Sequence, residues 1–152
     1  MSGAALERLN SLSDAHLRDE LRRCFDSEVW AAEVARQRPF ADLGALLAAA
    51  NSAWTVMDEG EWAKAFEALA ERSVPPGDAD TRAGAAVALD LYRSRFGYIF
   101  VTDAEHATAD ELLMLIRIRL GHEKAAEARR SREEYRNLVR RRLERWLDPD
   151  AG

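Results

Sequence analysis

Helical periodicity along almost the whole chain is the feature that most limits how this sequence can fold. Apolar residues recur at spacings of three and four, which is the pattern of amphipathic helices. The 8 glycines and 4 prolines of the 152 residues fall mainly at the breaks of this pattern. The sequence predicts helices over Ala15–Phe25, Asp26–Arg36, Ala41–Trp54, Glu59–Arg72, Asp78–Arg95, Thr108–Leu120 and Glu123–Leu147.

Side chains that cap helix starts support these boundaries. A short polar side chain just before a helix accepts a hydrogen bond from a free backbone N–H of the first turn. Such residues precede five predicted helices: Ser13-Asp14, Asp26-Ser27, Asp58, Asp78 or Asp80, and Thr108. The fold class is therefore predicted to be all-α.

One short segment, FGYIFV from Phe96 to Val101, is the only strand-like run in the sequence. It has no second strand to pair with, so its backbone N–H and C=O groups need other partners. Two interpretations remain open. The segment is either a buried connector bonded to side chains and water, or an extended stretch whose free backbone groups bind a ligand.

Size and composition exclude several classes of protein. A chain of 152 residues and 17.1 kDa is predicted to form one domain over 1–152. The single cysteine, Cys24, excludes a disulfide framework, and three scattered histidines predict no metal site. No apolar run is long enough to cross a bilayer, and the first residues do not resemble a secretory signal. We expect a cytoplasmic protein that does not bind membranes.

Charge is distributed unevenly along the chain. Residues 117–147 carry eleven basic and five acidic residues, whereas residues 1–116 are strongly acidic. A basic helix can bind nucleic acid. However, acids alternate with the bases at i,i+4 as Arg129/Glu133, Arg130/Glu134 and Arg140/Glu144, which is typical of a solvent-facing helix. We therefore predict no nucleic-acid partner.

Two arginines fall within apolar stripes. Arg119 lies among Leu112, Leu115, Ile116 and Leu120, and Arg142 lies between Leu138 and Trp146. An arginine in such a position extends to solvent, pairs with a carboxylate, or binds an anionic ligand. An internal ion pair and a carboxylate-binding pocket between helices both remain open for these two residues.

Common catalytic motifs are absent from the sequence. It has no GxSxG, P-loop, GxGxxG or HExxH pattern, so no cofactor is predicted. His106 lies in the loop after FGYIFV, where a histidine is either simply exposed or a general acid or base.

Three stretches together resemble the family of 2-oxo-4-hydroxy-4-carboxy-5-ureidoimidazoline (OHCU) decarboxylases. The first runs from Leu9 to Trp54 and includes a tryptophan followed by Arg38-Pro39-Phe40. The second, Leu91–Val101, resembles the family's FGF-x-F signature, and the third resembles its closing helix with an Arg-Leu pair. The resemblance implies a single all-α helical bundle of the family's type and a decarboxylation without cofactor that yields (S)-allantoin.

The resemblance also implies site residues. The family pocket is lined by the stretch after the signature, which corresponds here to Phe100, Val101, Thr102, Asp103 and Ala104. A family arginine on the last helix corresponds to Arg142.

The main departure from the family concerns its catalytic histidine, which sits in a His-Pro pair after the fourth helix. The alignment places Leu69-Ala70 there. The family's following segment, with a serine and a Glu-Gln pair, is shortened here and lacks Glu-Gln. Leucine cannot transfer a proton, so the family's acid–base step has lost its agent.

These observations lead to two hypotheses. The first is a diverged lyase that acts without cofactor on a small carboxylated or keto molecule other than OHCU. Arg142 and Arg119 would bind the substrate's anionic group, Leu69 would line the pocket, and Tyr98, Asp103 and His106 would transfer protons. The second is a non-catalytic helical protein that binds a ligand or a protein partner. A homodimer is compatible with both.

Overall fold

The structure is a computed structural model that describes residues 3–69, 73–104 and 108–148. Within these ranges the regular elements are all helical, and no strand is present. The all-α prediction is confirmed. The elements, in chain order, are α1 (Gly3–Ser11), α2 (Asp14–Cys24), α3 (Glu28–Arg36), α4 (Leu43–Ser52), the 3₁₀ turn η1 (Ala53–Val56), α5 (Glu59–Glu67), α6 (Ala79–Phe96), α7 (Ala109–Leu120) and α8 (Lys124–Leu147).

The predicted helix starts agree with the structure. Ser13, Ser27, Asp58, Asp78 and Thr108 each accept a hydrogen bond from a backbone N–H three residues later. Asp78, not Asp80, is the cap of α6. The sequence pattern did not predict α1, and α5 ends at Glu67 rather than continuing toward Arg72, which lies outside the described residues.

The chain divides into two compact units. The first contains Met1–Ala65 and Arg136–Gly152, and the second contains Phe66–Tyr135. The long helix α8 contributes its C-terminal half to the first unit and its N-terminal half to the second. One domain over 1–152 stays a prediction.

Aromatic side chains form the centre of the first unit. Trp30, Trp54 and Trp62 stack in a row, with ring centroids 5.2 and 5.5 Å apart. Phe25 meets all three rings edge-on or nearly so, at 4.9–5.5 Å. Edge-to-face and stacked pairs stabilise beyond the burial of their area. We call Trp30, Trp54 and Trp62 the tryptophan row.

The Arg38-Pro39-Phe40 motif is held by a side chain from α1. Asn10 accepts a hydrogen bond from the backbone N–H of Phe40 at 2.8 Å and donates one to the Phe40 carbonyl at 2.9 Å. Phe40 is buried. This pair of bonds satisfies the backbone where the chain leaves α3 and has no helix to provide partners.

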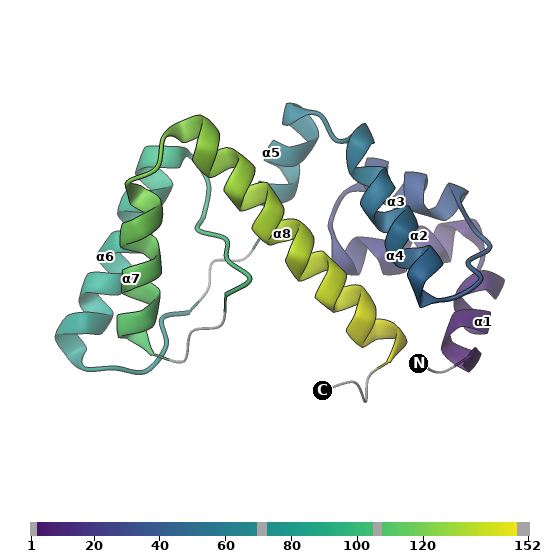
Figure 1. Cartoon of the computed structure of the whole chain (residues 1–152), viewed down its shortest axis with the longest axis horizontal. Helices are drawn as coiled ribbons and strands as arrows, with labels where there is room; N and C mark the ends of the chain where they lie inside the picture. Colours follow the sequence, from purple (N-terminus) through teal and green to yellow (C-terminus); the bar gives the residue numbers. More distant parts are fainter. Residues whose placement is uncertain (1–2, 70–72, 105–107, 149–152) are drawn as a thin grey trace. The chain divides into compact units, whose positions relative to one another are not determined.

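In the second unit, α6 and α7 run side by side in the same direction (Figure 1). Their N-terminal ends are joined by a bond from the N–H of Ala109 to the Pro76 carbonyl, and their C-terminal ends by one from Arg95 to the His122 carbonyl. The chain must therefore travel back along the helices between them. Gly97, with φ of 85°, ends α6, and an extended run over residues 99–103 begins the return. The predicted short extended segment is confirmed, but it covers residues 99–103 rather than Phe96–Val101, because Phe96 is the last residue of α6 and Gly97 is its cap.

Candidate functional site

A buried polar cluster occupies the interior of the second unit. It consists of Tyr92 on α6, Arg119 on α7, and Glu127, Ser131 and Glu134 on α8. All five residues are at most 4% exposed. Buried polar groups require hydrogen-bond partners, and these residues provide them to one another.

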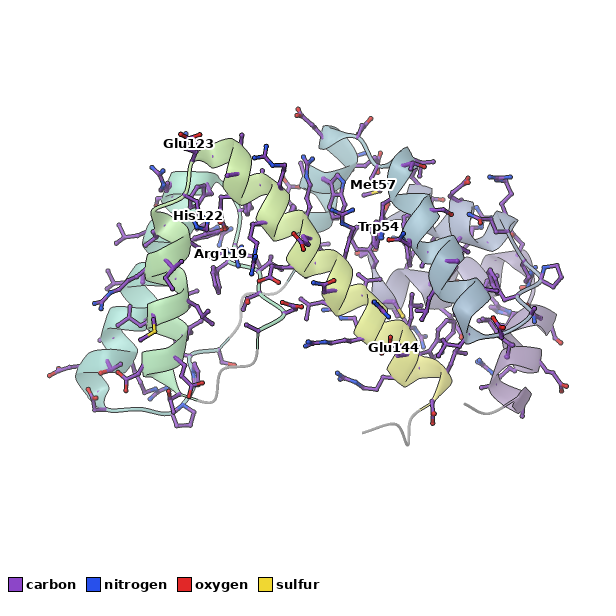
Figure 2. All side chains as sticks on the ribbon, viewed as in Figure 1. Trp54, Met57, Arg119, His122, Glu123 and Glu144 are labelled. Carbon is purple, nitrogen blue, oxygen red and sulfur yellow. The ribbon has the colours of Figure 1, made fainter. Side chains whose placement is uncertain are left out.

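Arg119 is the centre of the buried polar cluster. Its Nε donates to Glu127 at 2.7 Å, one Nη to the Val101 carbonyl at 2.6 Å, and the other to Ser131 at 3.0 Å. Figure 2 labels Arg119 near the C-terminal end of α7, with His122 just beyond it. Of the two interpretations left open by the sequence, the structure shows an internal ion pair with Glu127. A role for Arg119 in binding substrate stays a prediction.

Glu127 is charged within this cluster. Burial alone would raise the pKa of its carboxyl, but hydrogen bonds from Arg119, Tyr92 and His122 outweigh burial and lower that pKa. Burial and the bond to Glu127 raise the pKa of the Tyr92 hydroxyl, so Tyr92 remains a neutral donor. His122, on the opposite side of the carboxylate, lies 3.0 Å from it through Nδ1.

The extended segment packs against the buried polar cluster. Phe100, Val101 and Thr102 are each at most 4% exposed, and the ring of Phe100 lies 4.6 Å from the Arg119 guanidinium carbon. The Val101 carbonyl is bound by Arg119. No group in the described part of the chain accepts a hydrogen bond from the backbone N–H of Phe100, Val101 or Thr102. Unpaired buried N–H groups are rare and favour the ligand-binding interpretation of this segment.

Two carboxyl groups meet near the Thr102 side chain. The Glu134 side chain accepts a hydrogen bond from the Thr102 hydroxyl at 3.2 Å and is bonded to the Asp103 carboxyl. Burial raises the pKa of Glu134, and the neighbouring Asp103 carboxyl raises it further. Two carboxyls that share a proton are a recurring arrangement for acid–base chemistry. We call Asp103 and Glu134 the carboxyl pair.

The remaining predicted residues of this stretch lie nearby or outside the described residues. The N–H of Ala104 donates to the Thr102 hydroxyl at 3.0 Å. The Tyr98 ring stacks on Phe66 at 4.9 Å, and its hydroxyl lies 3.5 Å from Ser131. Leu69 is half-buried just after α5. His106 lies outside the described residues.

Arg142 belongs to the first unit and lines a pocket there. The pocket measures about 280 Å³ and is bounded by Glu20, Arg23, Cys24, Arg142, Arg145 and Trp146. One guanidinium nitrogen of Arg142 donates to the Cys24 carbonyl at 2.9 Å. Burial raises the pKa of the Cys24 thiol to about 11, so this cysteine is not a nucleophile at neutral pH.

Sequence reasoning missed Glu134 as a site residue because it interpreted Arg130/Glu134 as a solvent-facing pair. Arg130 is exposed and lies 3.5 Å from Glu134, but the Glu134 carboxylate is buried. The signal was present in the spacing, since Glu127, Ser131 and Glu134 recur at four and three residues and share one face of α8. The Arg140/Glu144 pair is exposed, as expected.

The sequence model of the family described as OHCU decarboxylase matches residues 10–73 and 70–144 of this chain. The chain belongs to the OHCU decarboxylase family. No curated protein matches it significantly by sequence.

Solved structures share the fold of this family member. One, described as OHCU decarboxylase in the presence of (S)-allantoin, superposes with a TM-score of 0.76 at 20% identity, covering 85% of this chain and 97% of that one. Another, an (S)-allantoin synthase, gives a TM-score of 0.78 at 19% identity, covering 94% of this chain and 54% of that one. At such identities the likeness establishes the fold alone.

The described residues of this OHCU decarboxylase family member also bear on membrane and metal binding. Among the described helices, none is long and apolar enough to cross a membrane. Within the same ranges no group of three or more His, Cys, Asp or Glu residues is placed to hold a metal ion.

Proposed function

We propose that this protein is a diverged OHCU decarboxylase-family lyase that acts without cofactor on a small carboxylated or keto molecule other than OHCU. One observation supports this most strongly. The backbone N–H groups of Phe100 and Thr102 have no acceptor among the described residues, and the Thr102 hydroxyl contacts the carboxyl pair, in the segment that the family resemblance implies lines the pocket. Backbone hydrogen-bond donors can stabilise a developing oxyanion, and a carboxyl with a raised pKa can supply a proton.

The chemistry of such a step follows from these groups. When the carbon–carbon bond to the carboxylate of a 3-keto acid breaks, CO₂ leaves and the electron pair moves through the neighbouring carbon into the β-carbonyl, giving an enolate. Backbone N–H donors stabilise the enolate oxygen. The carboxyl pair then gives a proton to the carbon and is reprotonated from water. Arg142 lies in the first unit, and its role in binding the anionic group of the substrate stays a prediction.

In this proposal the carboxyl pair supplies the proton in place of the family's histidine, which the sequence alignment predicts to be missing. Leu69 stands where that histidine is expected, and its side chain cannot give or take a proton. The two family-model segments meet at residues 70–73, next to this position. A proton donor on a different element would reach the carbon that lost CO₂ from another direction, and we therefore expect the substrate to differ from OHCU.

A two-part assay tests the proposal. Purified protein is added to freshly generated OHCU, and chiral allantoin is followed by circular dichroism; no enantioselective formation above the spontaneous rate is expected. In parallel, CO₂ release is measured from a panel of small 3-keto carboxylates. For the substrate that reacts, Asp103→Asn and Glu134→Gln should each lower turnover by roughly 10²–10⁴.

Glu133→Gln is the matched control, because Glu133 neighbours Glu134 on α8 but is exposed. It should leave turnover unchanged. Rapid, enantioselective conversion of OHCU would contradict the predicted change of substrate. Full activity of Glu134→Gln on a panel substrate would contradict the role of the carboxyl pair.

The internal pairing of Arg119 favours a second candidate, a ligand-binding protein without catalysis. Arg119 is occupied by Glu127, Val101 and Ser131, so it serves the fold in this structure. A panel compound that stabilises the protein against heat but is recovered unchanged would favour this candidate.

A further inference from the structure

A second pocket of the first unit lies apart from the one that Arg142 lines. It measures about 290 Å³ and lies between the α4–η1 region and the C-terminal half of α8. Its apolar lining comes from Leu47, Ala50, Trp54, Val139 and Leu143. Pockets of this size and mostly apolar lining accommodate small organic molecules.

Polar side chains surround this apolar floor. Asn51 lies on α4, and Arg136, Asn137 and Arg140 lie on α8. The Asn51, Arg136 and Asn137 side chains make no hydrogen bond or ion pair with other described residues. Water can satisfy these exposed polar groups, but their position around a concave apolar surface also suits them to contact a ligand. This arrangement fixes a ligand's orientation through a few polar contacts.

The charge at this pocket selects for anions. Two guanidinium groups line it, and no carboxylate does. Arg140 is paired with Glu144 at 3.1 Å in an exposed i,i+4 contact, whereas Arg136 has no carboxylate partner among the described residues. A carboxylate that entered here would gain a charged hydrogen bond without breaking an internal pair of Arg136.

Trp54 adds a surface for an apolar or planar group. Trp54, labelled in Figure 2, is the middle member of the tryptophan row. It is half-buried, whereas Trp30 and Trp62 are buried. The Trp30 indole N–H donates to the Ala50 carbonyl at 3.1 Å. The Trp54 indole N–H has no acceptor within the described residues and remains available to a ligand.

From these observations we infer that this pocket is a binding site for a small organic carboxylate with an apolar body. The carboxylate meets Arg136 and Arg140, and the body lies on Trp54 and Leu47. The site is separate from the proposed reaction. Arg140 and Arg142 are two residues apart on α8 and so point about 200° apart around the helix, and the two pockets share no residue.

The test uses 4-phenylbutyrate as the probe and 4-phenyl-1-butanol, which lacks the charge, as its matched control. Isothermal titration calorimetry measures affinity and stoichiometry, and tryptophan fluorescence reports contact with the tryptophan row. We expect saturable one-to-one binding of the carboxylate at least about tenfold tighter than binding of the alcohol, with a change in fluorescence.

Variants locate the site. Arg136→Gln with Arg140→Gln should weaken binding by about tenfold or more, and Ala48→Trp should abolish it by filling the pocket, because Ala48 is an exposed lining residue. The control pair Arg129→Gln with Arg141→Gln removes the same charge from α8 outside the pocket and should change affinity by less than about twofold. Trp54→Phe should retain calorimetric binding and lose most of the fluorescence change. Melting curves confirm that each variant folds.

Three outcomes would overturn the inference: no saturable binding, equal binding of carboxylate and alcohol, or equal effects of the pocket pair and the control pair. Arg142→Gln separates this site from the proposed reaction, because it should leave 4-phenylbutyrate affinity unchanged. If Arg142→Gln lost affinity while Ala48→Trp bound as tightly as wild type, the ligand would lie in the pocket that Arg142 lines. That result would also overturn the inference.

Discussion

The buried ion pair between Arg119 and Glu127 shows how single residues contribute to the packing of this fold. The two side chains lie on different helices, separated by the break at Gly121, and both are buried. The apolar periodicity showed that Arg119 lies within an apolar stripe. Its ion-pair partner could not be predicted from sequence spacing, because several acidic residues of α8 are similarly near in sequence. Only the packing of α7 against α8 selects Glu127.

The first prediction concerns Glu127→Gln. Removing one charge of the buried pair leaves Arg119 with only the more distant Glu134 carboxylate at 3.6 Å, so the free energy of unfolding should fall by about 3–5 kcal/mol at pH 7. Urea denaturation measures this. Because the pKa of Glu127 is lowered on folding, its contribution is present above the ordinary carboxyl pKa and is lost as pH falls through the folded value. Glu127→Gln should therefore remove the contribution of Glu127 to the fall in unfolding free energy at acid pH.

The exposed Glu123, one turn earlier and just before α8, provides the control for this prediction (Figure 2). Glu123→Gln removes the same charge where water already solvates it, so stability should change by less than about 0.5 kcal/mol. Equal stabilities of Glu127→Gln and Glu123→Gln would show that the buried ion pair contributes nothing.

A second prediction concerns the carboxyl pair. Burial and Asp103 raise the pKa of Glu134, so its carboxyl carbon should titrate above the ordinary glutamate value of about 4.3 in ¹³C NMR. Asp103→Asn removes the like charge and should shift this titration downward. If Glu134 acts as the general acid, turnover should fall as pH rises through the same raised pKa. A Glu134 titration that Asp103→Asn does not move would contradict the coupling.

Among the elements, the helices were largely predictable and the extended segment only in part. Caps and apolar spacing are local signals, and they located most helix starts to within a residue or two, as at Ser13 and Thr108. The helix α1 was missed because its first turn has no strong cap signal. The segment FGYIFV was recognised as extended, but its partners come from α7 and α8, and no local pattern encodes them.

A third prediction belongs to this segment. Thr102→Ala removes a hydroxyl that bonds to Glu134 and to the Ala104 N–H, which should cost about 1–2 kcal/mol of unfolding free energy. Thr102→Pro also removes the backbone N–H donor and fixes φ. If that donor binds the substrate, Thr102→Pro should lose turnover on the panel substrate well beyond the loss in Thr102→Ala. Equal turnover of the two variants would show that the N–H takes no part.

At the scale of the whole molecule, α8 is a single helix that serves two compact units. Fold class and helix order followed from the sequence, but the division at Ala65 and Tyr135 did not, because it depends on contacts between distant segments. The pocket of Arg142 and the buried polar cluster likewise bring together residues from several helices, and only tertiary packing defines them.

The fourth prediction tests whether the two units unfold together. Cys24 lies in the first unit, is buried, and has a pKa raised to about 11, so a thiol reagent at neutral pH should modify it only when that unit opens. Helix formation is cooperative, and α8 belongs to both units. Glu127→Gln, a change in the second unit, should therefore accelerate Cys24 labelling measured by absorbance. A labelling rate equal to that of wild type would show that the units open independently.

The parallel course of α6 and α7 also determines where the sequence can change length. The twelve residues of α7 are about 18 Å long, whereas the connection from Gly97 to Thr108 could reach about 40 Å if fully extended. This connection has spare length, so insertions and deletions after Asp103 can be absorbed without moving either helix. A single-residue deletion inside α7 would instead rotate Arg119 by about 100° away from Glu127. Over evolutionary time, related chains should vary in length in the loop and keep the helix in register.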